Sequence, residues 1–255
     1  MLTNRKNRQF DLTASRKNVA IDRTRPLRDA IQQISCPMTS LRIGLLGGTF
    51  DPVHYGHLAM AEAAIRRFQL QAVYFVTAVN PPHKSHTTCA NFLDRHAMVA
   101  LALIHKPKMV PSSLEYGRSG KSYSIDTVRQ LNREFENRAE IFFLMGMDAF
   151  LELPAWKDYR LLIRYCNFVV YPRPGSDGES VGNRLPRSLL KRVFQIPNGA
   201  PVAVHPGHRI YLIKDFSNRI SSTEIRGRVR QGGSLERVVP KAVSEYIDRT
   251  RLYLS

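Results

Sequence analysis

The stretch Gly44–Leu58 reads Gly-Leu-Leu-Gly-Gly-Thr-Phe-Asp-Pro-Val-His-Tyr-Gly-His-Leu. It begins as an apolar strand and runs into Gly47 and Gly48, which allow tight turning and close approach of a ligand to main-chain N–H groups. Pro52 keeps a helix from starting too early, and the expected helix begins near Gly56. Its unpaired amides and positive dipole end then face the end of the strand, so this stretch predicts an anion site.

Two histidines flank the expected helix start. His54 and His57 are three residues apart, so both rings can point into one phosphate-sized space. Imidazoles there can donate hydrogen bonds to phosphoryl oxygens and, when protonated, add positive charge as negative charge builds in a transition state. Taken singly, either histidine is more often a helix-end or surface residue. The stretch lacks the Lys-Ser/Thr of a Walker loop and the spacing of G-x-G-x-x-G, which removes the main support for a kinase or a dehydrogenase.

Outward from this stretch, apolar runs of strand length alternate with segments of helical period, a pattern typical of a parallel sheet covered by helices. Strands are expected at Arg42–Leu46, Ala72–Val76, Lys108–Pro111, Ile141–Met145, Phe168–Tyr171 and Arg209–Ile213. Helices are expected at Gly56–Phe68, Asp94–Ile104, Ser124–Phe135, Ser222–Arg230 and Pro240–Thr250. The predicted fold class is therefore α/β, a Rossmann-like parallel sheet covered by helices, with a helical C-terminal part. Two Pro-rich loops, Asn80–Asn91 and Pro172–Asn183, follow strands, where open α/β sheets bind their ligands.

Residues 1–40 differ from the rest in composition. They are rich in Arg, Lys, Asn and Thr and show no sustained apolar period, which is typical of a flexible basic extension. Met38 is an alternative start. The chain is thus expected to consist of this extension and one domain over residues 41–255.

Composition bounds the function without choosing it. The formal charge of +17 favours an anionic partner, and both phosphate-bearing small molecules and nucleic acid qualify. The three cysteines are far apart and outside any C-x-x-C spacing, so neither a disulfide framework nor a zinc site is indicated. No apolar run approaches the about 20 residues that span a bilayer, and no signal peptide is evident, so the expected location is the cytoplasm and no membrane partner is expected.

A second candidate phosphate site lies far downstream, in Ile-Ser-Ser-Thr-Glu-Ile-Arg at residues 220–226. Ser221, Ser222 and Thr223 are good helix caps that can leave backbone amides for a phosphate, while Arg226, one turn in, can reach β- and γ-phosphates. Alone, this segment is more often a capped surface helix. The first stretch resembles the G-x-F-x-P-x-H-x-G-H signature of the nucleotidyltransferase superfamily and this one resembles its I-S-S-T-x-I-R element, so each supports the other. The resemblance implies that ATP is bound by Gly47, Gly48, Thr49, Phe50, His54, Gly56, His57, Ser221, Ser222, Thr223 and Arg226. Among these, His54, His57 and Arg226 are the implied catalytic groups.

The middle of the chain bears on the second substrate. From Leu41 almost to Tyr253 the sequence resembles bacterial nicotinate-nucleotide adenylyltransferases, in Asn-Pro-Pro-His-Lys at 80–84, Ser-Tyr-Ser at 122–124, Gly-Met-Asp at 146–148, Leu-Pro-Ala-Trp at 153–156 and Arg-Pro-Gly at 173–175. The resemblance implies a mononucleotide side made of Lys84, Ser122, Tyr123, Ser124, Asp148 and Trp156.

Each of these residues has two open interpretations. Trp156 either stacks on a pyridine ring or packs in the core, and Lys84 either meets a phosphate or is exposed. Asp148 follows a strand, where a carboxylate can accept hydrogen bonds from ribose hydroxyls, and it is also a candidate N-cap. The amides of Ser122–Ser124 can hold a carboxylate as well as start a helix. The resemblance implies that this carboxylate separates nicotinate from nicotinamide, although no residue in the sequence proves the preference.

The implied reaction is attack of the 5′-phosphate of nicotinate mononucleotide on the α-phosphorus of ATP, which gives deamido-NAD and pyrophosphate. Such a transfer relies on alignment and charge stabilisation and needs no covalent intermediate. Mg²⁺ is expected to arrive with ATP and to need no dedicated protein cage, with Asp51 as a weaker outer-ligand candidate than as a turn residue. Adenylylation of nicotinamide mononucleotide or pantetheine phosphate is the close alternative, and nucleic-acid binding is the rival from another class.

Overall fold

The computed structural model describes residues 41–81, 89–172, 185–196, 199, 201–216 and 218–254. The chain divides into two units, residues 1–38 and 39–255, and only the second contains described residues. The expected basic extension, Lys84 and much of the two Pro-rich loops therefore lie outside the described residues. Among the described residues no helix is long and apolar enough to cross a membrane.

The described chain forms an all-parallel sheet of seven strands in the order β3-β2-β1-β4-β5-β7-β6. The strands are β1 (Leu41–Gly48), β2 (Ala72–Thr77), β3 (Met109–Ser112), β4 (Ala139–Gly146), β5 (Asn167–Tyr171), β6 (Val193–Ile196) and β7 (Ile210–Ile213). The chain adds strands on one side of β1 and then returns to its other side at β4, so β1 and β4 mark the switch point. Ligands of open α/β sheets bind in the crevice beyond the strand ends at this point.

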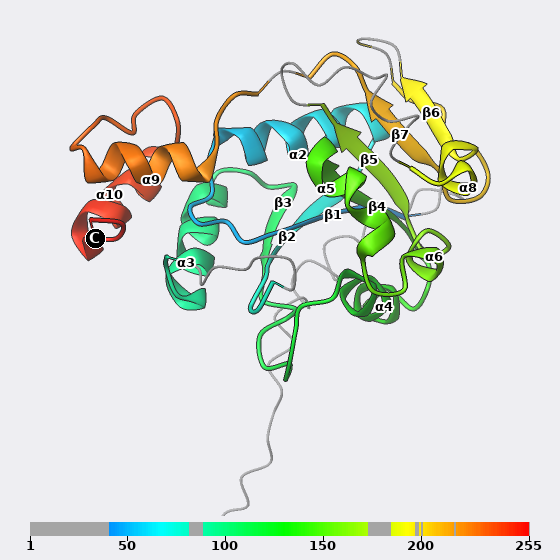
Figure 1. Ribbon diagram of the computed structural model, residues 1–255, viewed down its shortest axis with the longest axis horizontal. Helices are drawn as coiled ribbons and strands as arrows, with labels where there is room; N and C mark the ends of the chain where they lie inside the picture. Colours follow the sequence, from blue (N-terminus) through cyan, green and yellow to red (C-terminus); the bar gives the residue numbers. More distant parts are fainter. Residues whose placement is uncertain are drawn as a thin grey trace, which may run out of the picture. The chain divides into compact units, whose positions relative to one another are not determined.

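Helices cover both faces of the sheet. They are α2 (Tyr55–Phe68), α3 (Phe92–Leu103), α4 (Ser124–Glu134), α5 (Met147–Leu151), η1 (Leu153–Ala155), α6 (Tyr159–Leu162), α8 (Arg187–Leu190), α9 (Ser222–Arg230) and α10 (Lys241–Thr250). Figure 1 shows α9 and α10 as a pair beyond α3, with the C-terminus beside them. The α/β class with a helical C-terminal part is confirmed.

Successive side chains of the central strands point to opposite faces, as the pleat requires. On one face, Leu46 and Phe142 belong to a large core with the buried sides of α2, α3, α9 and α10. Leu45 and Phe143 lie outside that core although both are buried. The central strands therefore read as continuous apolar runs, because they are buried on both faces.

Candidate functional site

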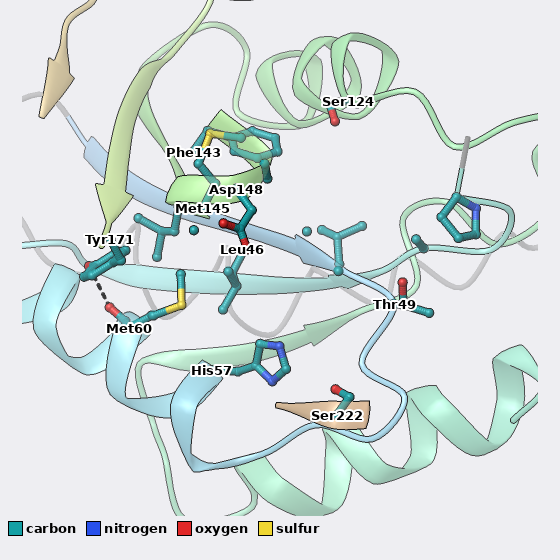
Figure 2. Close-up of a pocket in the computed structure, with 18 of the residues that line it drawn as sticks. Leu46, Thr49, His57, Met60, Ser124, Phe143, Met145, Asp148, Tyr171 and Ser222 are labelled. Carbon is teal, nitrogen blue, oxygen red and sulfur yellow. Dashed lines mark hydrogen bonds between the residues drawn. The ribbon is translucent and has the colours of Figure 1, made fainter. Parts of the chain in front are cut away.

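A pocket of about 590 Å³ opens at the switch point of the sheet. Its floor is formed by the ends of β1 and β4, with Leu46, Gly47 and Gly48 on the first and Leu144, Met145 and Gly146 on the second. The starts of α2, α4, α5 and α9 surround it. Figure 2 shows Asp148 directed into the middle of this space, with His57 across from it and Ser222 next to His57.

The two histidines of the first motif stack on each other at the start of α2. The ring centroids of His54 and His57 are 3.7 Å apart at an interplanar angle of 28°. The backbone N–H of His54 donates to His57 Nδ1 at 3.3 Å. In a neutral imidazole the other ring nitrogen then carries the hydrogen, so His57 Nε2 is the donor of this ring. Because His57 lines the pocket, that donor belongs to the site.

His54 differs from its neighbour in burial. Its side chain is buried at 5% exposure, and this burial lowers the pKa of the imidazole from 6.5 to about 4. His54 is therefore neutral at pH 7 and supplies no positive charge there, which removes one of the two roles expected for it. What it retains is the ability to hydrogen-bond and to hold the His57 ring in place.

The second motif caps α9 and binds to the first motif. Ser221 Oγ accepts a hydrogen bond from the backbone N–H of Glu224 at 3.2 Å, as an N-cap does. Ser222 Oγ donates to the carbonyl of Pro52 at 3.0 Å. Arg226 Nη1 donates to the carbonyl of Asp51 at 2.7 Å. Segments about 170 residues apart are thus joined directly at the pocket.

Arg226 does not line the pocket, contrary to the simplest expectation for a phosphate-binding arginine. Its guanidinium is held by the Asp51 carbonyl, and Nη2 donates to Thr223 Oγ1 at 3.3 Å. In this arrangement Arg226 supports the turn of the first motif, and contact with a phosphate would require its side chain to turn.

The opposite side of the pocket is built by the start of α4. Ser122 Oγ accepts hydrogen bonds from the backbone N–H groups of Val79 and Asn80 at 3.2 and 3.1 Å. The N–H of Ser122 donates to the Asn80 carbonyl at 2.9 Å. The Ser122 hydroxyl thus fastens the chain after β2 to the start of α4. The N-cap of α4 is Tyr123, and Ser124 is its first residue.

Trp156 lies at the end of η1 and is half-buried. Its ring meets Phe143 of β4 edge to face, with centroids 5.9 Å apart. Lys157 Nζ lies 4.4 Å from the Tyr123 ring centroid and 3.6 Å from Asp126 Oδ2. These contacts gather aromatic rings and one ammonium group at this end of the pocket.

Comparison with known proteins identifies the family of the chain that forms this pocket. The sequence profile of the cytidylyltransferase-like family matches residues 45–228. A probable nicotinate-nucleotide adenylyltransferase of Geobacter sulfurreducens is 39% identical over 213 residues, which are 84% of this chain and 98% of that protein. One from Moorella thermoacetica is 41% identical over 212 residues, 83% of this chain and 91% of the relative.

The chain belongs to the nicotinate-nucleotide adenylyltransferase family.

A solved structure shares its fold. The Plasmodium falciparum nicotinic acid mononucleotide adenylyltransferase complexed with NaAD superposes with a TM-score of 0.63 at 20% identity, over 84% of this chain and 97% of that one. At this identity the likeness concerns the fold, and it agrees with the parallel sheet described above.

Most residues predicted for an adenylyltransferase site meet in one pocket. The lining includes Gly47, Gly48, Thr49, His54, His57, Ser122, Tyr123, Ser124, Asp148, Trp156, Ser221, Ser222 and Thr223. Phe50, Gly56 and Arg226 do not line it. Phe50 is buried behind the loop with its ring edge to face with His57, 5.0 Å between centroids. Lys84 lies outside the described residues.

Several lining residues of this adenylyltransferase were not predicted from the sequence. Asn218 is packed so closely against Gly56 that a Cβ there would lie 1.7 Å from its Nδ2. Glu115, buried at 6% exposure, accepts a hydrogen bond from Thr127 Oγ1 at 2.6 Å. Tyr171, at the end of β5, donates to the Met60 carbonyl at 2.8 Å, as Figure 2 shows. Its place at the end of a strand could have predicted Tyr171 as a site residue, whereas no local sequence pattern indicates Asn218 or Glu115.

The acidic groups around the pocket differ in burial and in their hydrogen bonds. Among the described residues, no three His, Cys, Asp or Glu side chains gather as a metal cluster. The Asp51 carboxylate is buried and accepts hydrogen bonds from the N–H groups of Cys89 and Ala90 and from the Tyr253 hydroxyl. Asp51 is thus the turn residue that was expected rather than an outer metal ligand. Asp148 is an exposed carboxylate that lines the pocket.

Proposed function

We propose that this chain transfers the adenylyl group of ATP to nicotinate mononucleotide, which yields deamido-NAD and pyrophosphate. The observation that carries the proposal is a single pocket lined by both nucleotidyltransferase motifs on one side and by Ser122–Ser124, Asp148 and Trp156 on the other. Its volume is within the usual range for small-molecule sites, about 300–1,000 Å³. Membership of the nicotinate-nucleotide adenylyltransferase family supplies the substrate class.

ATP is assigned to the side of α2 and α9. Gly47 and Gly48 let the triphosphate approach the backbone, and the positive end of the α2 dipole attracts its charge. His57 Nε2 donates a hydrogen bond to a phosphoryl oxygen on which charge increases in the transition state. His54 holds the His57 ring through their stacked contact. Ser221–Thr223 offer the start of α9 to the outer phosphates.

The mononucleotide is assigned to the side of α4, α5 and η1. Trp156 offers an aromatic face for the pyridine ring, and the start of α4 at Ser124 offers the positive end of a helix dipole to the nicotinate carboxylate. The N–H groups of Ser122 and Tyr123, which were also expected to bind it, donate to the carbonyls of Asn80 and Lys121. Asp148 accepts hydrogen bonds from ribose hydroxyls, which suits an exposed carboxylate after a strand. Lys84 remains a candidate for the 5′-phosphate.

The reaction proceeds by direct displacement. An oxygen of the 5′-phosphate forms a bond to the α-phosphorus of ATP, and the bond from that phosphorus to the β-phosphate oxygen breaks. Pyrophosphate leaves with the electron pair. The protein aligns the two phosphates and stabilises the developing charge, as in other phosphoryl-type transfers. Mg²⁺ bound to the ATP phosphates would neutralise part of their charge.

The test is a comparison of three acceptors. Purified protein is mixed with ATP and Mg²⁺ and with nicotinate mononucleotide, nicotinamide mononucleotide or pantetheine phosphate, and pyrophosphate release is followed. We expect kcat/KM for nicotinate mononucleotide to exceed both others by at least about tenfold, since donors aimed at a carboxylate discriminate against neutral groups. A higher value for another acceptor would replace the proposed substrate, and no release with any of the three would refute adenylyl transfer.

His57→Ala shows whether the measured activity belongs to this pocket. Removing the Nε2 donor should lower kcat by roughly a hundredfold or more, the usual loss for one transition-state donor. The melting temperature should change little because His57 is only partly buried. Near-normal turnover would place His57 among ordinary helix-end residues.

A further inference from the structure

Several hydrogen bonds to its carbonyl groups hold the turn of the first motif in place. The donors come from three parts of the chain: the residue after β2, α3 and α9. The pairs are Gly48 with the N–H of Ala78 at 2.9 Å, Thr49 with Arg95 at 2.6 Å, Asp51 with Arg226 at 2.7 Å and Pro52 with Ser222 at 3.0 Å. With the carbonyls bound in this way, the turn cannot rotate without breaking several hydrogen bonds.

Asp51 is the centre of this arrangement. Its carboxylate is 4% exposed and accepts three hydrogen bonds. Oδ2 accepts from the N–H of Cys89 at 2.8 Å, and Oδ1 accepts from the N–H of Ala90 at 3.2 Å and from the Tyr253 hydroxyl at 2.8 Å. One side chain of the motif therefore binds both the residues that precede α3 and the end of the chain.

Arg95 completes the arrangement from α3. It is 1% exposed, and besides Thr49 it binds the carbonyls of Ala78 at 2.8 Å and Ala90 at 3.1 Å. Burial lowers the pKa of its guanidinium, and the nearby Asp51 carboxylate opposes that effect. A buried cation and a buried anion thus stabilise each other across the back of the turn, which is the condition under which buried charges are tolerated.

Tyr253 brings the last residues of the chain into the same cluster. It follows α10 and is 5% exposed. Burial and the neighbouring Asp51 raise the pKa of its phenol, so the hydroxyl stays a donor throughout the physiological range. A hydrogen bond to a buried carboxylate is among the stronger kinds in proteins.

We propose that Tyr253 is a positioning residue of the adenylyl-transfer site, acting through Asp51 on the phosphate-binding turn. The inference rests on the proposed function. The Tyr253 hydroxyl fixes the Asp51 carboxylate, Asp51 fixes the turn that precedes His54, and the turn sets where the glycine amides and His57 meet the triphosphate. The end of the chain is therefore part of the support of the active site although Tyr253 does not line the pocket.

The chain offers a matched control for the test. Tyr246 in α10 donates to Asp94 Oδ1 in α3 at 2.8 Å, which is the same kind of bond, from a tyrosine hydroxyl to an aspartate, in the same part of the chain. That bond does not involve the motif. Tyr253→Phe and Tyr246→Phe each remove one hydroxyl from a Tyr–Asp pair, so an effect of lost stability alone should appear in both.

The measurements are kcat, KM for ATP, KM for nicotinate mononucleotide and the melting temperature. For Tyr253→Phe we expect kcat to fall by about tenfold, because misplacement of a site by less than 1 Å is costly, while KM for the mononucleotide stays within about twofold. Tyr246→Phe should keep kcat within about twofold even if its melting temperature falls by a similar amount. Full kcat in folded Tyr253→Phe, or equal losses in the two variants, would overturn the proposal.

A second variant tests the route through Asp51 and also serves if Tyr253→Phe does not fold. Asp51→Asn keeps one acceptor oxygen but loses the charge and one acceptor, so its kcat should fall at least about tenfold. The double variant should lose little beyond the larger single loss, because both changes break the same connection. Additive losses would show that Tyr253 acts independently of Asp51. If the wild-type chain releases no pyrophosphate, the proposed function fails, and ATP affinity by calorimetry then decides whether Tyr253 still positions the turn.

Discussion

His54 and His57 have the same side chain and almost the same place in the sequence, yet their surroundings give them different properties. His54 is buried and neutral, whereas His57 lines the pocket with Nδ1 occupied by the His54 N–H. The pair therefore contains one supporting ring and one ring that can donate to a phosphate. Spacing alone predicts that both rings lie at one place but not that they divide these roles.

The burial of His54 makes a prediction about stability and pH. With its pKa lowered to about 4 in the folded state, the unfolded chain binds the extra proton first as pH falls below about 6.5. The free energy of unfolding should therefore be insensitive to His54 above about pH 6.5 and decrease between there and pH 4. Between pH 7 and pH 4.5, the free energy of unfolding measured by urea titration should fall by roughly 2–3 kcal/mol less in His54→Asn than in the wild type. Equal losses would contradict the buried, neutral assignment.

Trp156 carries a prediction about substrate affinity. If its ring stacks on the pyridine, Trp156→Ala should raise KM for the mononucleotide by about tenfold or more, since base stacking on an aromatic residue contributes about 1–3 kcal/mol. KM for ATP should stay within about twofold, and Trp156→Phe, which keeps an aromatic face, should lose less. An unchanged mononucleotide KM together with a lower melting temperature would assign the ring to packing against Phe143.

Residue types at the site were predictable from the sequence, but the directions of their side chains were not. The motif spacing placed Ser221–Thr223 at the pocket, yet Arg226 one turn later binds the Asp51 carbonyl instead of lining it. Ser122 was expected to face a ligand, and its hydroxyl binds Val79 and Asn80. In each case the partner comes from a distant segment, and contacts of that kind leave no local pattern in the sequence.

At the scale of elements, long periodic segments were predicted well, whereas several short ones were missed, although the four-residue strands β3 and β7 were predicted. The expected helix from Gly56 corresponds to α2, Tyr55–Phe68, and six expected strands are present. Strand β6 and the helices α5, α6 and α8 have only four or five residues each, too few for a hydrophobic period to be visible. The missed helix α5 is the one that presents Asp148.

The contact between α2 and the segment before α9 gives a prediction at this scale. A Cβ at Gly56 would lie 1.7 Å from Asn218 Nδ2, so Gly56→Ala must displace Asn218 from the pocket wall. We expect a loss of stability of about 1–3 kcal/mol, as for other overpacked sites, and a higher KM for ATP. The measurements are urea unfolding and steady-state kinetics.

Two further variants make that result specific. Asn218→Ala together with Gly56→Ala should recover part of the lost stability, because the smaller side chain leaves room for the new methyl group. Gly227→Ala, in α9 with open space around its Cβ, should be neutral or slightly stabilising. A Gly56→Ala protein as stable and active as Gly227→Ala would show that Asn218 can move away at no cost.

At the scale of the whole molecule, the strand order explains why residues from so many segments meet. The chain reverses direction across the sheet between β3 and β4, so the loops after β1 and β4 diverge and leave a crevice between them. Both motifs and the Asp148–Trp156 segment lie around that crevice. The sequence predicts the parallel sheet from its alternation of strands and helices, whereas the position of β7 between β5 and β6 depends on long-range pairing that no local pattern encodes.

The division of the chain gives the last prediction. The seven strands, the residues that line the pocket and Tyr253 all lie between residues 41 and 254, and the matches to relatives cover 84% of the chain. A variant that begins at Met38 should therefore fold with an unchanged melting temperature and keep kcat/KM for both substrates within about twofold. Because residues 1–40 are strongly basic, any weak, salt-sensitive binding of RNA by the full chain should decrease in the same variant. Loss of adenylyl transfer on removing residues 1–37 would instead assign those residues a part in the enzyme.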